Sequence, residues 1–198
     1  MQSNLRGFLA LAAGLALSLQ ASASDVPEKS LAEVLSESRA VVHGRVVDQF
    51  SQWEEYGEHK IIFTYSTLRV EHGQFRQLPE TSEVVVRTVG GSVEGYTQLL
   101  IDEASFTLGE EVIVFLGLEE DWLHLSVSNF RQGKYTVVRG ADGRIRGVRQ
   151  DAGQQTDPAK LDERPLIPLS RFAADLRRAR RGLAEGETSD VHPLTPVR

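Results

Sequence analysis

The sequence predicts a mainly β protein: an antiparallel β-barrel with a short helix before it and a second helix after it. Between residues 40 and 150, short runs rich in Val, Ile and Thr follow one another at hairpin distances, without helical crossovers. Apolar residues at helical spacing flank this region, near residue 34 and near residue 176. Closure into a barrel is favoured because it removes unpaired strand edges.

Residues 1–23 have the order of a cleavable secretory signal peptide. Arg6 gives an early positive charge, an apolar stretch follows from Phe8 to Leu19, and Ala21–Ala23 supplies the small-residue cleavage site. This stretch has 12 residues, whereas a membrane-spanning helix needs roughly 20. We therefore expect an exported protein, periplasmic or secreted, without membrane insertion after cleavage.

Composition restricts both the core and the partners. The chain has no cysteine, so burial alone must stabilise the domain that we expect at residues 24–149. Its net charge of −6 becomes −7 when Arg6 is removed with the signal peptide. A negative protein repels nucleic acids and anionic membranes, so we expect neither as a partner.

The first elements of the domain can be placed from local patterns. Ser30 and Glu33 form a capping-box pattern, which predicts a short helix over about residues 30–38. A dense β-branched run predicts a strand from Ala40, and the polar segment 51–58 then predicts a loop. The further predicted strands are 61–73, 82–91, a weaker one at 96–101, 111–118, 121–128 (with Trp122 and His124 on one face), and a hairpin over 134–150 that turns at Asp142-Gly143.

A linker and a second helix complete the chain. Polar residues 150–164 predict a loose linker, and Ser170 is expected to cap the helix that follows. Phe172, Leu176 and Leu183 share one side of that helix and should pack on the barrel. The arginines at 177–181 are interpreted as ordinary charges in its last turns, and residues 186–198 as a disordered tail.

The region from Ser38 to Leu116 resembles the netrin-like version of the OB fold, the barrel used by tissue inhibitors of metalloproteases. It also resembles a broad set of exported bacterial proteins of uncharacterised function. The segments that carry the resemblance are Ser38–Val46, Thr64–Gly73, Val84–Thr88 and Leu108–Leu116, with Val89–Gly91 and Arg131–Tyr135 shared with the bacterial set. The resemblance implies an OB-like barrel.

The inhibitory mechanism of that family does not transfer to this chain. In the family, an N-terminal cysteine chelates the zinc of the protease, and disulfides hold that segment in place. Here the expected mature start is Ser24 and the chain has no cysteine. The resemblance therefore leaves the target open.

No catalytic, metal-binding or cofactor motif is present, so we expect no cofactor. The string Gly91-Ser92-Val93-Glu94-Gly95 lacks the spacing of a nucleophile elbow, and no pair of histidines has metal-ligand spacing. A site assembled across strands stays open, with His43 and His72 in neighbouring predicted strands. The acidic groups at 54–58, 110–111 and 119–121 are interpreted as solvated charges, with Glu110 and Glu111 on opposite faces.

Exposed aromatic side chains near glycines give the best candidates for partner binding. Trp53 and Tyr56 lie in the segment 51–58, and Gly90, Gly91 and Tyr96 lie in the segment 90–97. The sequence therefore favours a non-catalytic binding module for another exported protein, with a mode of action like that of a protease inhibitor left open. The alternatives are a hydrolase or metal-dependent enzyme with a site built across strands, and a structural envelope component.

Overall fold

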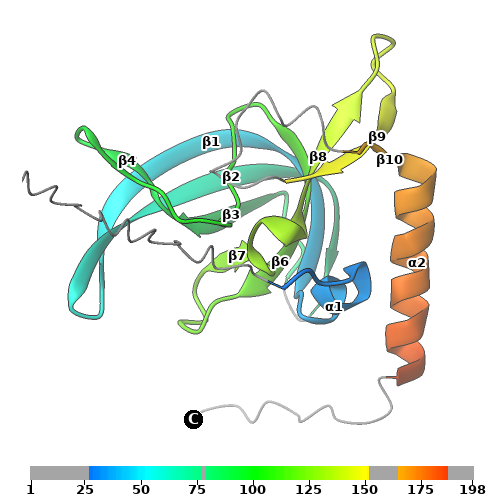
Figure 1. The fold of residues 1–198 in the computed structure, drawn as a ribbon, viewed down its shortest axis with the longest axis horizontal. Helices are drawn as coiled ribbons and strands as arrows, with labels where there is room; N and C mark the ends of the chain where they lie inside the picture. The colour runs from blue at the N-terminus through cyan, green and yellow to red at the C-terminus, as the bar shows by residue number, and fades with distance from the viewer. Residues whose placement is uncertain (1–26, 77–78, 152–164, 187–198) are drawn as a thin grey trace, which may run out of the picture.

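A computed structural model describes residues 27–76, 79–151 and 165–186 of the 198-residue chain. The fold is mainly β, with one large sheet and two helices (Figure 1). The predicted signal peptide, most of the predicted linker and nearly all of the predicted tail lie outside the described residues. The elements are α1 (Leu31–Ser36), β1 (Ala40–Tyr56), β2 (His59–Phe75), β3 (Glu83–Val89), β4 (Gly91–Val93), β5 (Tyr96–Gln98), β6 (Glu111–Leu118), β7 (Leu125–Val127), the 3-10 helix η1 (Phe130–Gly133), β8 (Lys134–Arg139), β9 (Ile145–Gln150), β10 (Ile167–Pro168) and α2 (Leu169–Gly186).

The main sheet has eight strands in the order β1-β2-β3-β7-β6-β8-β9-β10, and β1 also pairs with β6. The first half of β1 therefore pairs with β2 on one side and with β6 on the other. The β3–β7 pair is parallel, and the other pairs of this sheet are antiparallel. Followed from β1 through β2, β3, β7 and β6, the pairings return to β1.

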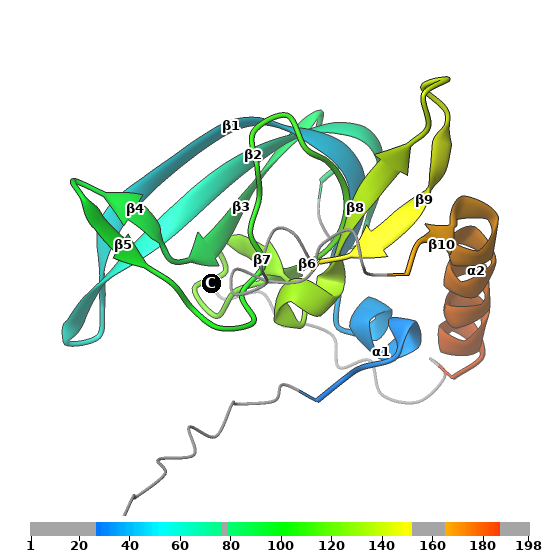
Figure 2. The ribbon, with the colours of Figure 1, turned by 45° about the horizontal axis from the view of Figure 1, so that its top comes forward.

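The distal half of β1 and the start of β2 form a long hairpin that extends beyond these pairings (Figure 2). The prediction of a loop over 51–58 is wrong, because the register continues to the pair Tyr56 and His59, leaving only a two-residue turn. Gly57 adopts a positive φ of 61° in this turn. The end of this hairpin is exposed, so its strands can carry polar side chains. Polar composition therefore did not distinguish these strands from a loop.

Three other predicted strands are shorter than expected. The third ends at Val89, and the residues after it form a separate small hairpin of β4 and β5, so the weak strand predicted at 96–101 is only Tyr96–Gln98. The strand predicted at 121–128 is only Leu125–Val127. Asp121 Oδ1 accepts the amides of Leu123 and His124 at 2.9 and 3.1 Å, which folds residues 121–124 into a turn instead.

Both predicted helices are present. The capping box at the start of α1 is confirmed, with the Glu33 amide donating to Ser30 Oγ and the Ser30 amide donating to the Glu33 carboxylate. Helix α2 begins at Leu169, directly after Pro168, so Ser170 lies inside the first turn and is not the expected cap. The hairpin of β8 and β9 is confirmed, with Gly143 at a φ of 73° in its turn.

The core has two parts, one on each face of β6. Val112, Val114 and Leu116 point to one side and pack with the inward residues of β1, β2 and β3. Phe115 points to the other side, where both helices pack. There the ring of Phe172 lies 4.9 Å from that of Tyr135, and Leu176 and Leu183 adjoin the same cluster, as predicted. Strand alternation thus gives β6 two apolar faces.

Candidate functional site

The structure brings together two of the predicted partner-binding residues. The rings of Trp53 on β1 and Tyr96 on β5 meet edge to face with centroids 6.0 Å apart. Trp53 is 39% exposed and Tyr96 is 67% exposed. We call this pair the aromatic platform. It joins segments that are far apart in the sequence but side by side in the fold.

The glycines of the predicted site have a structural role beneath this platform. Gly91 has a φ of 131°, and a Cβ there would overlap Thr64 Oγ1 and come within 2.6 Å of Ser51 Oγ. The carbonyl of Gly90 accepts the Thr64 hydroxyl at 2.6 Å. The glycines therefore let the β4–β5 hairpin lie directly against the long hairpin, in agreement with the predicted close backbone approach.

Tyr56 lies on the opposite face of the long hairpin from Trp53. Its ring lies 6.2 Å from that of Phe63. Both side chains line a cleft of about 440 Å³ that is bounded further by Val127 on β7, Phe130 on η1 and Glu103 in the loop before β6. The predicted site is thus divided between two faces.

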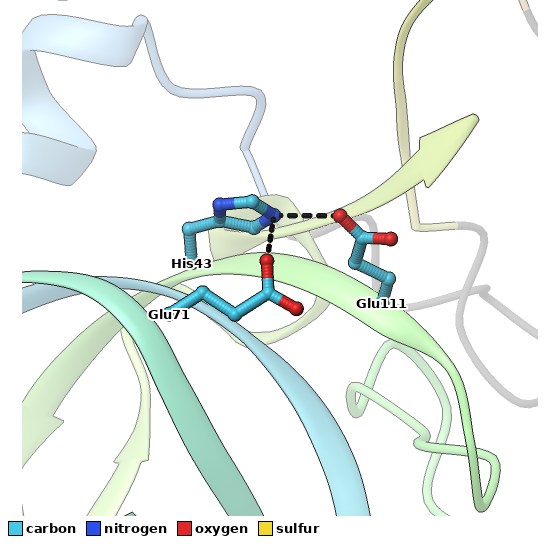
Figure 3. Close-up of side chains that lie close together, drawn as sticks. All are labelled: His43, Glu71 and Glu111. Carbon is cyan, nitrogen blue, oxygen red and sulfur yellow. Dashed lines mark hydrogen bonds and ion pairs between the residues drawn. The ribbon is translucent and has the colours of Figure 1, made fainter. Parts of the chain in front are cut away.

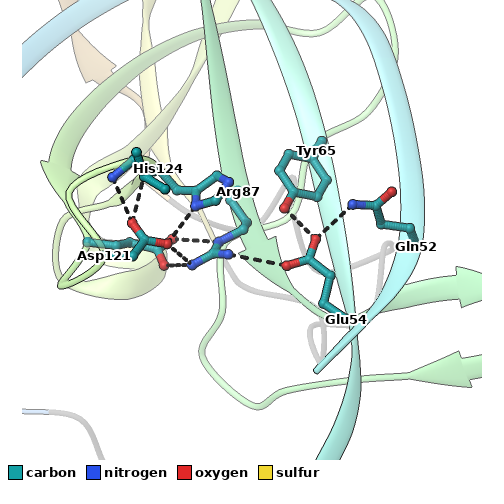
Figure 4. Close-up of polar contacts among 8 residues, drawn as sticks. Gln52, Glu54, Tyr65, Arg87, Asp121 and His124 are labelled. Atoms are coloured by element: carbon teal, nitrogen blue, oxygen red, sulfur yellow. Dashed lines mark hydrogen bonds and ion pairs between the residues drawn. The ribbon is translucent and has the colours of Figure 1, made fainter. Parts of the chain in front are cut away.

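A network of charged side chains surrounds Arg87 beside this cleft (Figure 4). The guanidinium binds the carboxylates of Glu119, Asp121 at 3.0 Å and Glu54 at 3.3 Å, and it lies 4.5 Å from the centre of the Phe63 ring. The Tyr65 hydroxyl donates to Glu54. Arg87 is only 8% exposed, whereas the three carboxylates around it are partly exposed.

His124 extends the network on the side of Asp121. Its Nδ1 lies 2.6 Å from Asp121 Oδ2, and its ring packs edge to face with Tyr65. The hydrogen bond from His124, together with the backbone amides, lowers the pKa of Asp121. An imidazole oriented by a carboxylate resembles part of a catalytic triad, but here the same carboxylate also binds Arg87. The arrangement is that of a structural ion network.

A second cluster lies where β1, β2 and β6 meet (Figure 3). His43 Nε2 lies 2.8 Å from Glu111 Oε1 and 3.7 Å from Glu71 Oε2, and these three ligand atoms lie within 4.8 Å of one another. His43 and His72 are cross-strand neighbours with rings 5.8 Å apart, so the predicted adjacency is confirmed.

Two arginines make this second cluster a poor metal site. Arg139 binds both carboxylate oxygens of Glu111, at 2.6 and 2.7 Å, and Arg45 binds one of them at 2.9 Å. The hydrogen bonds from Arg139 first, and then from His43, lower the pKa of Glu111 to about 2. A divalent cation would have to displace two guanidinium groups and would be repelled by their charges. The residues therefore fit a buried ion network better than a metal centre.

The interpretation of the acidic groups as solvated charges is wrong for several of them. Glu54, Glu119 and Asp121 converge on Arg87, while Glu110 binds Lys134 and Glu111 is 6% exposed. Glu110 and Glu111 do serve different partners, as strand alternation predicted. Arg87 stands among β-branched residues in the run 83–89. A charged residue in such a run could have indicated a buried ion network.

The fold and these sites define a mainly β protein with an aromatic platform, a cleft on the opposite face of the long hairpin, and two ion networks, each around a buried charge. Among the described residues, no helix is both long and apolar enough to cross a membrane. No protein-family model matches the chain, and comparisons with curated proteins and with solved structures gave no match.

Proposed function

We propose that this protein is an exported, non-catalytic binding module that recognises another exported protein through the aromatic platform of Trp53 and Tyr96. Residues 1–23 would serve as its signal peptide. Its scaffold would be an OB-like barrel, an interpretation supported by the return of the pairings from β6 to β1 and by the resemblance of Ser38–Leu116 to the netrin-like fold.

The observation that carries this proposal is the contact between Trp53 and Tyr96. Tryptophan and tyrosine dominate the binding energy of protein interfaces, because they bury large areas at a small cost in conformational entropy. Two such side chains, both partly exposed, are held in one place by two hairpins that pack closely at Gly91. A preorganised aromatic surface loses little freedom when a partner covers it.

The two histidine–carboxylate pairs belong to ion networks that include arginine. Glu111 and Asp121 each bind arginine as well as histidine, so neither carboxylate serves only to orient an imidazole. His43 Nε2 faces the carboxylates of Glu111 and Glu71.

The test is capture of partners from the periplasm and culture medium of the source organism by the immobilised mature protein. The Trp53→Ala, Tyr96→Ala double variant should lose the partner that the wild type recovers. The matched control is Trp122→Ala, Leu123→Ala, which removes two exposed apolar side chains (60% and 80% exposed) from a different turn. Equal recovery by the platform variant and the wild type would overturn the proposal.

A further inference from the structure

We propose that the cleft beside Arg87 is a binding site for an alkylammonium group, such as the side chain of lysine. The site lies on the face of the long hairpin opposite the aromatic platform, and the inference does not rest on the proposed function. It stands on the shape of the cleft, on one buried carboxyl group and on the charges that surround it.

The cleft combines apolar walls with a carboxyl group in its lining. The rings of Tyr56, Phe63 and Phe130 and the side chain of Val127 contribute to its lining, together with Glu103. Its volume of about 440 Å³ falls within the range of small-ligand sites. A hydrocarbon chain with one polar end would match this lining, with the chain against the rings and the polar end near Glu103.

Glu103 is a buried acid without a counter-ion. It is 6% exposed, and within residues 27–76, 79–151 and 165–186 no arginine, lysine or histidine forms an ion pair with it. The backbone amides of Ala104 and Val89 lower the pKa of its carboxyl group, but burial outweighs them. Buried carboxylates are normally paired with a cation. This one lines an open cleft that a cation can enter.

The charges around the cleft favour a positively charged ligand. Arg87 also lines the cleft, but its guanidinium is shared by Glu54, Glu119 and Asp121, so three carboxylates face one cation. Glu119 lines the cleft with Glu103. An anion would meet a negative surface there, whereas a cation would be attracted.

The aromatic lining favours an organic cation over a hydrated metal ion. Arg87 lies over the Phe63 ring, which shows that the ring face already stabilises one positive charge. Tyr56 and Phe130 add two further rings to the walls. An ammonium group on an alkyl chain can contact such rings and bond Glu103 at the same time, but a metal ion would have to give up water without gaining enough oxygen ligands.

Binding of this ligand should depend on pH through Glu103. Burial raises the pKa of Glu103 to about 7, and the nearby charge of Glu119 adds to this effect. The charged and titratable groups that line the cleft with it are Glu119, Arg87 and Tyr56. An alkylammonium group stays charged up to about pH 10, so the ligand keeps its charge between pH 6 and pH 8 while Glu103 becomes ionised. Affinity should therefore rise with pH, by roughly tenfold over that range.

The experiment follows backbone amide NMR signals of the mature protein during titration with n-butylamine, with n-butanol as the uncharged isostere and butyrate as the anion. Butylamine should shift the amides of Val89 and Ala104 and bind roughly tenfold more tightly at pH 8 than at pH 6. Glu103→Gln should weaken binding at pH 8 at least tenfold, whereas Glu80→Gln, at an exposed position, should leave it unchanged.

Equal binding of butanol, preferential binding of butyrate, or unchanged binding by Glu103→Gln would each overturn the inference. The spectrum of Glu103→Gln without ligand verifies that this variant is folded. The Trp53→Ala, Tyr96→Ala variant should bind butylamine normally. The capture experiment and the butylamine titration therefore test the two proposals separately.

Discussion

Lys134 Nζ lies 2.9 Å from Glu110 Oε1 in a position where the lysine side chain is only 3% exposed. The same ammonium lies 3.7 Å from Asp151 Oδ2 and 5.1 Å from the centre of the Phe106 ring. The Thr136 hydroxyl donates to the same oxygen of Glu110 at 2.6 Å. One buried cation thus links β8 to the start of β6 and to the residue that follows β9.

Replacing Lys134 by methionine should destabilise the protein by about 3–5 kcal/mol, because it removes the ammonium group that binds the largely buried carboxylate of Glu110. Urea unfolding at pH 7 measures this change. The matched control is Arg146→Met, which breaks an exposed pair with Asp142 and should cost less than about 1 kcal/mol. Equal losses in the two variants would show that the burial of Lys134 has no energetic consequence.

Glu103→Gln should stabilise the protein progressively as the pH rises. The pKa of Glu103 in the fold, about 7, lies above its ordinary value of 4.5. The folded state therefore holds the proton more tightly, and stability falls as pH rises from about 4.5 to about 7. Glutamine removes this loss, so its advantage over wild type should grow by about 2 kcal/mol between pH 5 and pH 8. Urea unfolding at both pH values checks this, and a constant difference would contradict it.

Glu111 should contribute stability that is lost in acid. Its pKa is lowered to about 2 by its hydrogen bonds, from Arg139 first, so its stabilising effect is complete above about pH 4.5 and disappears as the pH falls toward 2. The deficit of Glu111→Gln relative to wild type should shrink by about 2 kcal/mol between pH 7 and pH 3. Chemical unfolding of both proteins at these pH values measures the change. For Glu80→Gln the difference from wild type should stay constant.

Gly91→Ala should destabilise the fold by about 2–3 kcal/mol, since alanine disfavours the positive φ and its Cβ would overlap the Thr64 hydroxyl. Thermal unfolding provides the measurement. Gly182→Ala serves as the control, because this glycine lies in α2 with open space around its Cβ position. Alanine there should stabilise by about 0.5–1 kcal/mol. A similar effect at both positions would mean that the close approach of the two hairpins does not constrain Gly91.

Local patterns predicted much of this fold because they depend on neighbouring residues. The capping box at Ser30, the apolar side of α2 and the turn at Gly143 each involve residues within a few positions of one another. The adjacency of His43 and His72 also followed, because consecutive strands tend to pair. The error at 51–58 arose from polar composition, and the error at 121–128 arose because an alternating pattern extends into a turn that Asp121 forms with the amides of Leu123 and His124.

The ion networks and the cleft could not be predicted in this way. Glu54, Arg87 and Glu119 come from segments more than 30 residues apart, and only the pairing register sets their side chains on one face. A shift of one residue in a strand would turn its side chain to the opposite face. Glu103 is a similar case, because its burial depends on a loop packing beside β3 and η1.

The sequence by itself determined that the chain forms a mainly β domain with a helix on each side, because alternation and capping act between near neighbours. Only the tertiary structure decided that Trp53 meets Tyr96, that three acids share Arg87 and that Glu103 lines a cleft without a counter-ion. The physical reason is that burial and charge pairing depend on distances between strands. Those distances are set by the packing of the whole sheet and by no single segment of it.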